Sequence, residues 1–196
     1  MRGIGNLTSV SFMMLVASCL VNAQGTAAKK SQPGWKEYAY PEDGFAITLP
    51  EEPSSHEDQQ FPPASFKAYA VTRSQAYTVH LPQDLGVTLH VFAFPNGCSD
   101  FFGEYRDVIR RAKAGTLDAA KAGVSSKADP SSFRETTFNG HPAPEDERER
   151  ASHTRYYELT HCANRQLFMF TASWPTGSPK PQGLTRIISS FRHLTN

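Results

Sequence analysis

The segment Gln166–Ala172 constrains the fold more than any other part of the chain, because nearly every position in it is apolar. A strand with one buried face alternates apolar and polar residues, whereas a continuous apolar run is typical of a central strand covered on both faces. A short turn-like stretch, Cys162–Arg165, comes directly before it, so it reads as the second half of a hairpin. The sequence therefore predicts a sheet whose central strand has other structure packed on both sides.

Most other strand-like segments are also paired across short turns rich in Pro, Gly, Asp or Asn. Two hairpins are expected, formed by residues 76–81 with 87–94 and by residues 154–161 with 166–174. Further strands are expected at residues 35–40, 45–49, 65–72 and 133–138. Prolines and charged residues instead predict irregular structure over residues 50–63 and 142–150.

Two segments follow the helical period. In the first, Ser99 or Asp100 caps a helix that runs to about Ala114, and Gly115 ends it. The second is a C-terminal helix marked by the apolar residues Leu184, Ile187, Ile188 and Phe191. A short helical piece is also expected over residues 117–122.

The expected order is therefore strands, a helix, strands and a helix, with hairpins in place of regular strand–helix–strand alternation. That order favours an α+β fold, in which a mainly antiparallel sheet has helices packed on it. We expect residues 35–194 to form a single domain, because a chain of this length can bury a sizeable core.

Residues 1–23 have the pattern of a secretory signal peptide. Arg2 supplies the positive start, Val10–Val16 is a short apolar core, and Val21–Ala23 is a small-residue cleavage site that predicts cleavage before Gln24. The apolar core is too short to span a membrane as a helix. Residues 24–34 then read as a disordered polar leader.

A second processing route overlaps the first. Val16–Cys19 resembles the bacterial lipoprotein box, in which Cys19 is lipidated and becomes the first residue of the mature chain. Either route predicts an exported protein, secreted or periplasmic in the first case and membrane-anchored in the second.

The full chain has 20 basic and 19 acidic residues, and Arg2 is the only charged residue among residues 1–23. The mature chain is therefore neutral, and no nucleic-acid partner is expected.

Cysteine usage fits export. Two cysteines, Cys98 and Cys162, remain after residue 23. An even number of cysteines in an oxidising compartment predicts a disulfide, which here would close a loop of about 65 residues and stabilise the fold by roughly 4 kcal/mol. The alternative is a nucleophilic or metal-binding cysteine, but neither residue lies in a C-x-x-C motif.

The sequence contains no G-x-S-x-G, phosphate-binding or dinucleotide-binding motif, and we predict no catalytic residue and no cofactor. One metal hypothesis comes from the first hairpin. If Leu81 pairs with Val87, His80 and His90 become diagonal neighbours on one face, within reach of a common ion. The alternative is an ordinary polar sheet face, and a shifted register would separate the two histidines.

The pattern Gly44–Pro50 near the start of the domain, the central helix, and the ending formed by Arg165–Ala172 and Ile187–Phe191 together resemble the PsbP-like fold family. The resemblance implies an antiparallel sheet between helices, an α/β/α sandwich. It also implies a mainly non-enzymatic role, since members of that family are accessory subunits of photosynthetic complexes, assembly factors and a Ran-binding import factor.

Export, one compact domain and the lack of a catalytic motif together favour a non-catalytic accessory or binding domain that acts on a protein partner in the cell envelope. The alternative is a secreted, hydrolase-like enzyme whose active site carries no recognisable motif. A deep pocket that holds a titratable group with a strongly shifted pKa would favour the enzyme.

Overall fold

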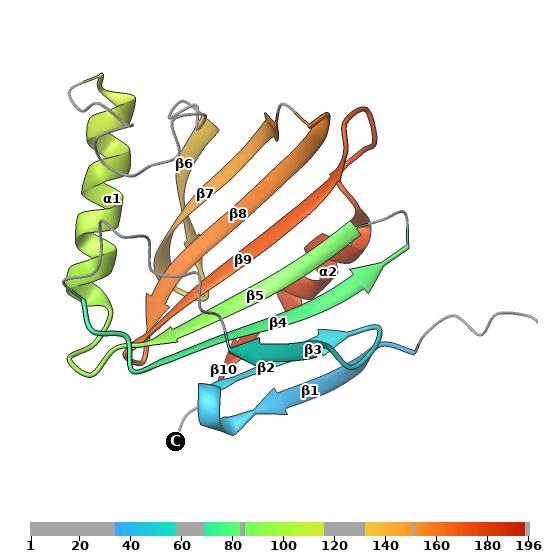
Figure 1. The fold of residues 1–196 in the computed structure, drawn as a ribbon, viewed down its shortest axis with the longest axis horizontal. Coiled ribbons are helices and arrows are strands. Elements are labelled where there is room, and N and C mark those ends of the chain that lie inside the picture. Colours follow the sequence, from blue (N-terminus) through green and yellow to red (C-terminus); the bar gives the residue numbers. More distant parts are fainter. Residues whose placement is uncertain (1–33, 58–68, 83–84, 116–131, 151, 195–196) are drawn as a thin grey trace, which may run out of the picture. The chain divides into compact units, whose positions relative to one another are not determined.

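Strand β9 (Gln166–Pro175) lies in the middle of a seven-stranded sheet whose order is β3-β4-β5-β9-β8-β7-β6 (Figure 1). Every neighbouring pair in this sheet is antiparallel. The other six strands are β3 (Ser54–Glu57), β4 (Arg73–Leu81), β5 (Leu85–Ala93), β6 (Phe133–Phe138), β7 (His141–Arg150) and β8 (Thr154–Ala163). The computed structural model describes residues 34–57, 69–82, 85–115, 132–150 and 152–194.

Successive side chains of β9 enter two different cores. Phe168 and Phe170 belong to a large core on one face of the sheet, whereas Leu167 and Met169 belong to a smaller core on the other. All four side chains are buried, which confirms the prediction that this strand is covered on both faces.

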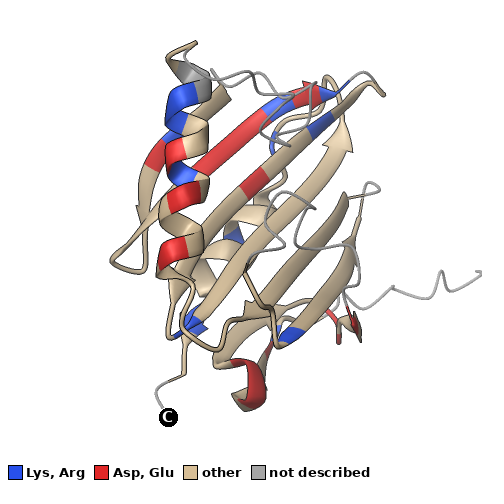
Figure 2. Cartoon of the chain, turned by 60° about the vertical axis from the view of Figure 1, so that its left-hand side comes forward, with Lys and Arg blue, Asp and Glu red and all other residues tan. Residues whose placement is uncertain are grey.

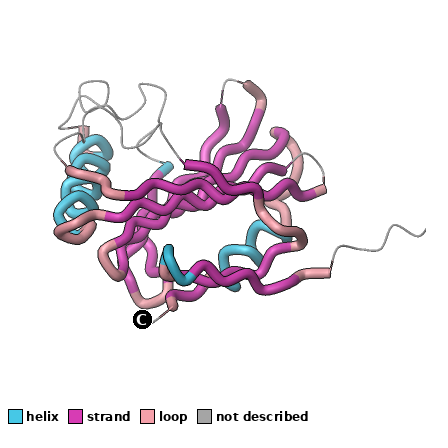
Figure 3. The backbone as a smooth tube through the Cα atoms, turned by 60° about the horizontal axis from the view of Figure 1, so that its bottom comes forward, coloured by secondary structure: helices cyan, strands magenta, loops and turns pink. Residues whose placement is uncertain are grey.

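The large core is closed by a second, three-stranded sheet and by helix α2 (Gln182–Ser190). The small sheet has the order β1-β2-β10 and consists of β1 (Lys36–Tyr40), β2 (Phe45–Leu49) and β10 (Arg192–His193). A short 3-10 helix, η1 (Pro41–Asp43), joins β1 to β2. Figure 3 shows the two sheets as separate layers, with α2 on the side where the small sheet lies.

The smaller core lies under helix α1 (Ser99–Lys113), which packs Phe101 and Phe102 toward Phe92 of β5. A disulfide between Cys98 and Cys162 joins the residue before α1 to strand β8. The disulfide predicted from the two cysteines is therefore confirmed, and it lies at the edge of the core that α1 covers.

The two helices thus lie on opposite faces of the large sheet, and the predicted α+β class with an antiparallel sheet is confirmed. The helix predicted at 99–114, the C-terminal helix and the strands at 35–40, 45–49 and 133–138 are found within a few residues of their expected bounds. Within the described residues, no helix is long and apolar enough to cross a membrane.

Three strand predictions were wrong. β3 forms inside residues 50–63, which were predicted to be an irregular loop. Of the strand predicted at 65–72, the described residues 69–72 are not in a strand, and β4 begins only at Arg73. β7 runs through Pro142 and Pro144, which pair with β6 only, since the ladder with β8 begins at Glu145. A proline lacks the N–H that a strand donates, so it is tolerated where the neighbouring strand is absent.

Several predicted segments lie outside the described residues. These are the signal peptide at 1–23, the leader up to residue 33, the parts of the expected loop and strand at 58–68, and the helical piece at 117–122.

Candidate ligand site at one end of the sheet

A cavity of about 540 Å³ opens at the end of the domain where β5 stops and β9 begins. Three segments far apart in the sequence form most of its wall: η1 with Gly44, the end of β5 with Phe94 and Pro95, and the β8–β9 turn. Thr72, which precedes β4, and Leu194, which follows β10, complete the lining. A volume of this size lies within the range of small-molecule sites in proteins.

The β8–β9 turn has an unusual backbone. Asn164 and Arg165 have φ values of 50° and 67°, both in the left-handed region, as a two-residue type I′ hairpin turn requires. Asn adopts this conformation readily, but for Arg it costs on the order of 1 kcal/mol. The turn therefore places a charged side chain in the cavity wall at a backbone position where glycine is more usual.

Two side chains of opposite charge line this cavity without neutralising each other. Arg165 lies on the β8–β9 turn and Glu42 lies on η1. Both side chains are exposed, and neither side chain forms a hydrogen bond or ion pair with another described residue. Asn164 adds a side-chain amide to the lining that is likewise unpaired among the described residues. A guanidinium recognises carboxylate or phosphate groups with two parallel hydrogen bonds.

The part of the wall that carries Glu42 is anchored by the buried carboxylate of the next residue, Asp43. Asp43 is 1% exposed and accepts hydrogen bonds from Arg73 Nε at 2.7 Å and Nη2 at 3.1 Å. The hydroxyl of Tyr77 donates to the same carboxylate. Burial, and then the hydrogen bond to Asp43, raise the pKa of Tyr77, so this phenol remains a donor at neutral pH.

Gly44 brings two walls of the cavity into close contact. Its φ of 64° is left-handed, its N–H donates to the carbonyl of Pro41 at 3.2 Å, and its carbonyl accepts from Leu194 N at 2.8 Å. A Cβ at this position would lie 2.8 Å from Oε1 of Gln166. Only glycine satisfies both requirements without a shift of its neighbours.

A second group of polar residues lies between α1 and the sheet, but its members are already paired with one another. Glu158 accepts from the hydroxyls of Tyr105 at 2.6 Å and Tyr156 at 2.8 Å. Asp146 is 0% exposed and is paired with Arg148, and burial raises the pKa of its carboxyl. Figure 2 shows basic and acidic residues interleaved along α1 and over the strands beside it.

This group corrects one interpretation of the sequence. Prolines and charged residues predict irregular structure over residues 142–150, and this prediction is wrong for the charged run at 145–150. It forms part of β7, where Glu145 and Asp146 are buried and Arg134, Arg148 and Lys180 neutralise them.

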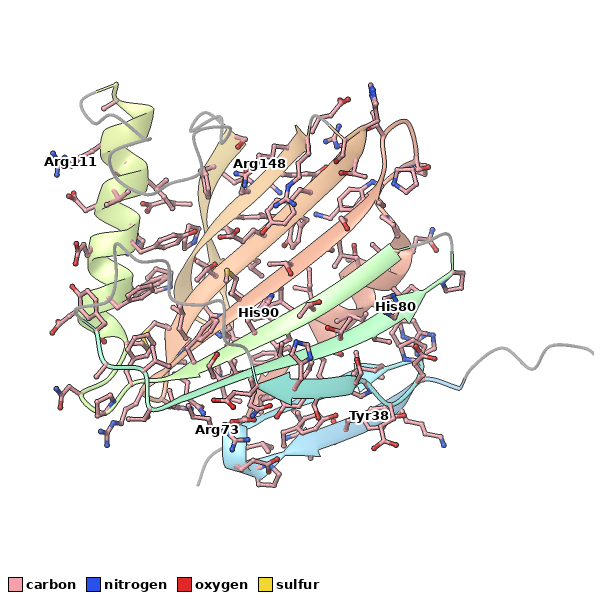
Figure 4. All side chains as sticks on the ribbon, in the orientation of Figure 1. Tyr38, Arg73, His80, His90, Arg111 and Arg148 are labelled. Atoms are coloured by element: carbon pink, nitrogen blue, oxygen red, sulfur yellow. A yellow bond between two sulfur atoms is a disulfide. The ribbon has the colours of Figure 1, made fainter. Side chains whose placement is uncertain are left out.

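The metal hypothesis for His80 and His90 rested on a register that is wrong. Leu81 pairs with Leu85, so His80 lies opposite Gly86 and His90 lies opposite Ala76. The Thr78–Thr88 pair separates them, and Figure 4 shows the two labelled histidines at different places along the hairpin. The physical reason is that Leu85 and Gly86 join the strand, so three residues separate β4 from β5 in place of the expected five.

Sequence reasoning located the β8–β9 turn but missed the cavity beside it. Hairpin spacing predicts a turn at Cys162–Arg165, yet Arg165 is not a residue typical of a left-handed position. The remaining walls come from residues near 42, 94 and 194, and nothing local in the sequence indicates that they meet.

Comparison with family models gives no match, and no curated protein matches the chain. Among solved structures, a crystal structure from Bacteroides thetaiotaomicron VPI-5482 aligns with a TM-score of 0.47 and 10% identity, and covers 82% of this chain and 48% of that one. This chain therefore spans about half the length of the Bacteroides protein. The solution structure of cyanobacterial PsbP (CyanoP) from Synechocystis sp. PCC 6803 aligns with a TM-score of 0.46 and 12% identity, and covers 87% of this chain and 98% of that one. The expected fold-level resemblance to PsbP is thus found at a low level of similarity, and it concerns the fold alone.

Proposed function

We propose that this chain is an exported, non-catalytic binding domain that recognises its ligand through the cavity at the end of the sheet. The observation that carries the proposal is a pair of charged side chains, Arg165 and Glu42, that have no ion-pair partner in the described part of the chain and line a cavity of about 540 Å³. The groups that line the cavity are suited to recognition: a guanidinium, a carboxylate, amides and a threonine hydroxyl.

The charges define a class of ligand. Arg165 favours a carboxylate or phosphate group, and Glu42 favours a cationic group at another point of the same cavity. A ligand that carries both, such as an amino acid or the charged end of an extended peptide from an envelope protein, satisfies the site best. Unpaired charged groups on both sides reject a purely apolar ligand, since binding it would desolvate them without compensation.

Export is supported by two independent features. The disulfide between Cys98 and Cys162 is typical of a protein that folds in an oxidising compartment. Residues 1–23 carry the signal pattern, with cleavage before Gln24 or, in the lipoprotein alternative, lipidation of Cys19. Mass spectrometry of the mature N-terminus decides between the two: a chain that begins at Gln24 supports secretion, and a diacylglyceryl group on Cys19 supports membrane anchoring. Recovery of the uncleaved chain would contradict export by either route.

The binding proposal is tested by titrating the mature protein with amino acids and short peptides while recording two-dimensional NMR spectra. We expect shifts at residues that line the cavity and a loss of affinity of about tenfold or more in Arg165→Ala, as for a lost charged hydrogen bond. Arg111→Ala is the matched control, because Arg111 is also exposed and lies on α1. Unchanged affinity in Arg165→Ala, or shifts confined to other surfaces, would contradict the proposal.

The secreted-enzyme alternative makes a different prediction for the same protein. An enzyme would turn over a panel of chromogenic ester, glycoside or phosphate substrates, whereas a binding domain leaves all of them unchanged. Reproducible turnover that copurifies with the protein would replace the present proposal.

A further inference from the structure

Three histidines that are far apart in the sequence meet at the edge of the large core. His141 begins β7, His161 lies in β8 and His193 lies in β10. Their ring centroids are separated by 5.1 Å (His161–His193), 5.7 Å (His141–His193) and 6.4 Å (His141–His161). None of the three was singled out by the sequence pattern.

The closest two rings face each other through their nitrogens. Nε2 of His161 lies 3.2 Å from Nε2 of His193, at an interplanar angle of 66°. Two imidazoles that bind one tetrahedral zinc ion at 2.0–2.1 Å have their nitrogens about 3.4 Å apart and their ring centroids roughly 5 Å apart. The pair therefore has nearly the spacing of two ligands of one ion.

Packing alone does not account for this pair. When both rings are neutral, the Nε2 of one donates to the other, and the accepting ring keeps its proton on Nδ1. The Nδ1 atoms of His161 and His193 are both buried, and neither has a hydrogen-bond partner among the described residues. One buried donor is therefore left unsatisfied, which costs about 1–3 kcal/mol.

The apolar surroundings of His161 and His193 keep both imidazole rings neutral, so their nitrogen lone pairs can bind a metal ion. His161 is 0% exposed and packs against aromatic rings of Phe138, Phe168 and Phe191. Burial, followed by the nearby histidines, lowers the pKa of His161 to about 3, and burial also lowers the pKa of His193. Both rings are neutral at pH 7, as metal ligation requires.

We propose that His141, His161 and His193 bind one divalent transition-metal ion of the zinc type, with the fourth position open to water. Imidazole nitrogens select such ions over magnesium or calcium, which take oxygen ligands. Among the described residues, no group of three His, Cys, Asp or Glu side chains is placed so that it could hold a metal ion without a rearrangement. His141 therefore has to turn its ring toward the pair, which its partly exposed place after the Asn139–Gly140 turn permits.

The expected affinity for the metal depends on the Nδ1 atoms of His161 and His193, which would not bind the ion themselves. Metal-bound histidines normally donate their second N–H to an acceptor, and loss of that contact weakens binding by about 10–100-fold. Neither Nδ1 atom has such an acceptor among the described residues. The site is therefore expected to exchange its metal readily and to be weaker than a structural zinc site.

The test uses the tag-free mature protein, with zinc and then cobalt titrated at pH 7.5. We expect one zinc ion per chain, a cobalt absorption spectrum typical of tetrahedral nitrogen ligation, and a rise in melting temperature with zinc. His193→Ala should reduce the affinity by at least tenfold, and His141→Ala should do so while leaving the metal-free melting temperature nearly unchanged. His80→Ala and His90→Ala are matched controls and should bind as the wild type does.

Absence of zinc binding at millimolar concentration would overturn the proposal, as would full affinity in both His141→Ala and His193→Ala. Failure of the metal proposal can be distinguished from failure of the ligand-binding proposal for the cavity, because Arg165→Ala should leave zinc binding unchanged. Conversely, His141→Ala should leave recognition at the cavity unchanged.

Discussion

Arg73 holds the buried carboxylate of Asp43 by two hydrogen bonds, from Nε at 2.7 Å and from Nη2 at 3.1 Å. Asp43 ends η1, and Arg73 begins β4 of the large sheet. The pair therefore attaches the small sheet to the large one at the point where the cavity opens. A buried charge requires such a partner, because burial without one costs several kcal/mol.

Arg73→Met keeps the apolar stem and removes the charge, which leaves Asp43 with Tyr77 as its remaining described donor. Breaking a fully buried pair costs about 3–5 kcal/mol, and because Arg73 is 43% exposed we expect about 2–3 kcal/mol. Urea denaturation measures the change in the free energy of unfolding. Arg111→Ala should change it by less than about 0.5 kcal/mol, and an equally small effect of Arg73→Met would show that Asp43 needs no ion pair.

The disulfide should contribute strongly to stability. Cys98 and Cys162 are separated by 64 positions, and closing a loop of that size stabilises a fold by about 4 kcal/mol in the chain-entropy model. Denaturation of the Cys98→Ala/Cys162→Ala protein, compared with the oxidised wild type, measures this contribution. Adding dithiothreitol to the wild type should lower its stability and should not affect the variant. Equal stability of the two oxidised proteins would contradict the expectation.

Acid should destabilise the protein through the buried histidines. The pKa of His161 in the folded protein is lowered to about 3, whereas in the unfolded chain it lies near 6.5. The unfolded state therefore takes up the proton first, so the stabilisation is complete above about pH 6.5 and decreases as the pH falls toward 3. The slope approaches 1.4 kcal/mol per pH unit for each such histidine.

This dependence is measured by urea denaturation at a series of pH values between 7.5 and 4. His161→Phe, which replaces the ring with an apolar one, should flatten the curve, and His80→Ala should leave it unchanged. If His161→Phe does not fold, His193→Ala provides the second comparison, since the pKa of His193 is lowered as well. A curve that stays flat in the wild type from pH 6.5 to 4 would contradict the assignment.

Gly44→Ala should both strain the backbone and displace a wall of the cavity. The new Cβ would lie 2.8 Å from Gln166 Oε1 at a φ of 64°. Gly115→Ala is a matched control, since Gly115 has a φ of 66° but no atom within 4 Å of the added Cβ. We expect both variants to lose about 1 kcal/mol from the positive φ and only Gly44→Ala to lose ligand affinity. NMR titration and urea denaturation of the two variants distinguish strain from the clash.

Elements with strong local patterns could be predicted from the sequence. Helix α1 and the β8–β9 hairpin have apolar periodicity and turn residues within a short window, so their position depends little on the rest of the chain. The central position of β9 also followed from composition alone, because a continuously apolar strand is stable only when both its faces are covered.

The elements that were missed depend on distant partners. β7 carries two prolines and a run of charges, and it is a strand because β6 and β8 pair with it and basic side chains neutralise its buried carboxylates. The histidine cluster and the cavity have the same origin. Each is assembled from residues whose nearness depends on strand order and register, and neither is encoded in a short pattern.

Strand β10 has a consequence for the way this protein is made. It pairs with β2, and nearby the N–H of Thr48 in β2 donates a hydrogen bond to Oγ of Ser190, 142 positions further along the chain. A nascent polypeptide that has been synthesised only through β8 has neither the third strand of the small sheet nor the second imidazole beside His161. Strand β2 therefore lacks a partner on one edge until residues 192–193 have been synthesised, and the small sheet cannot be completed before then.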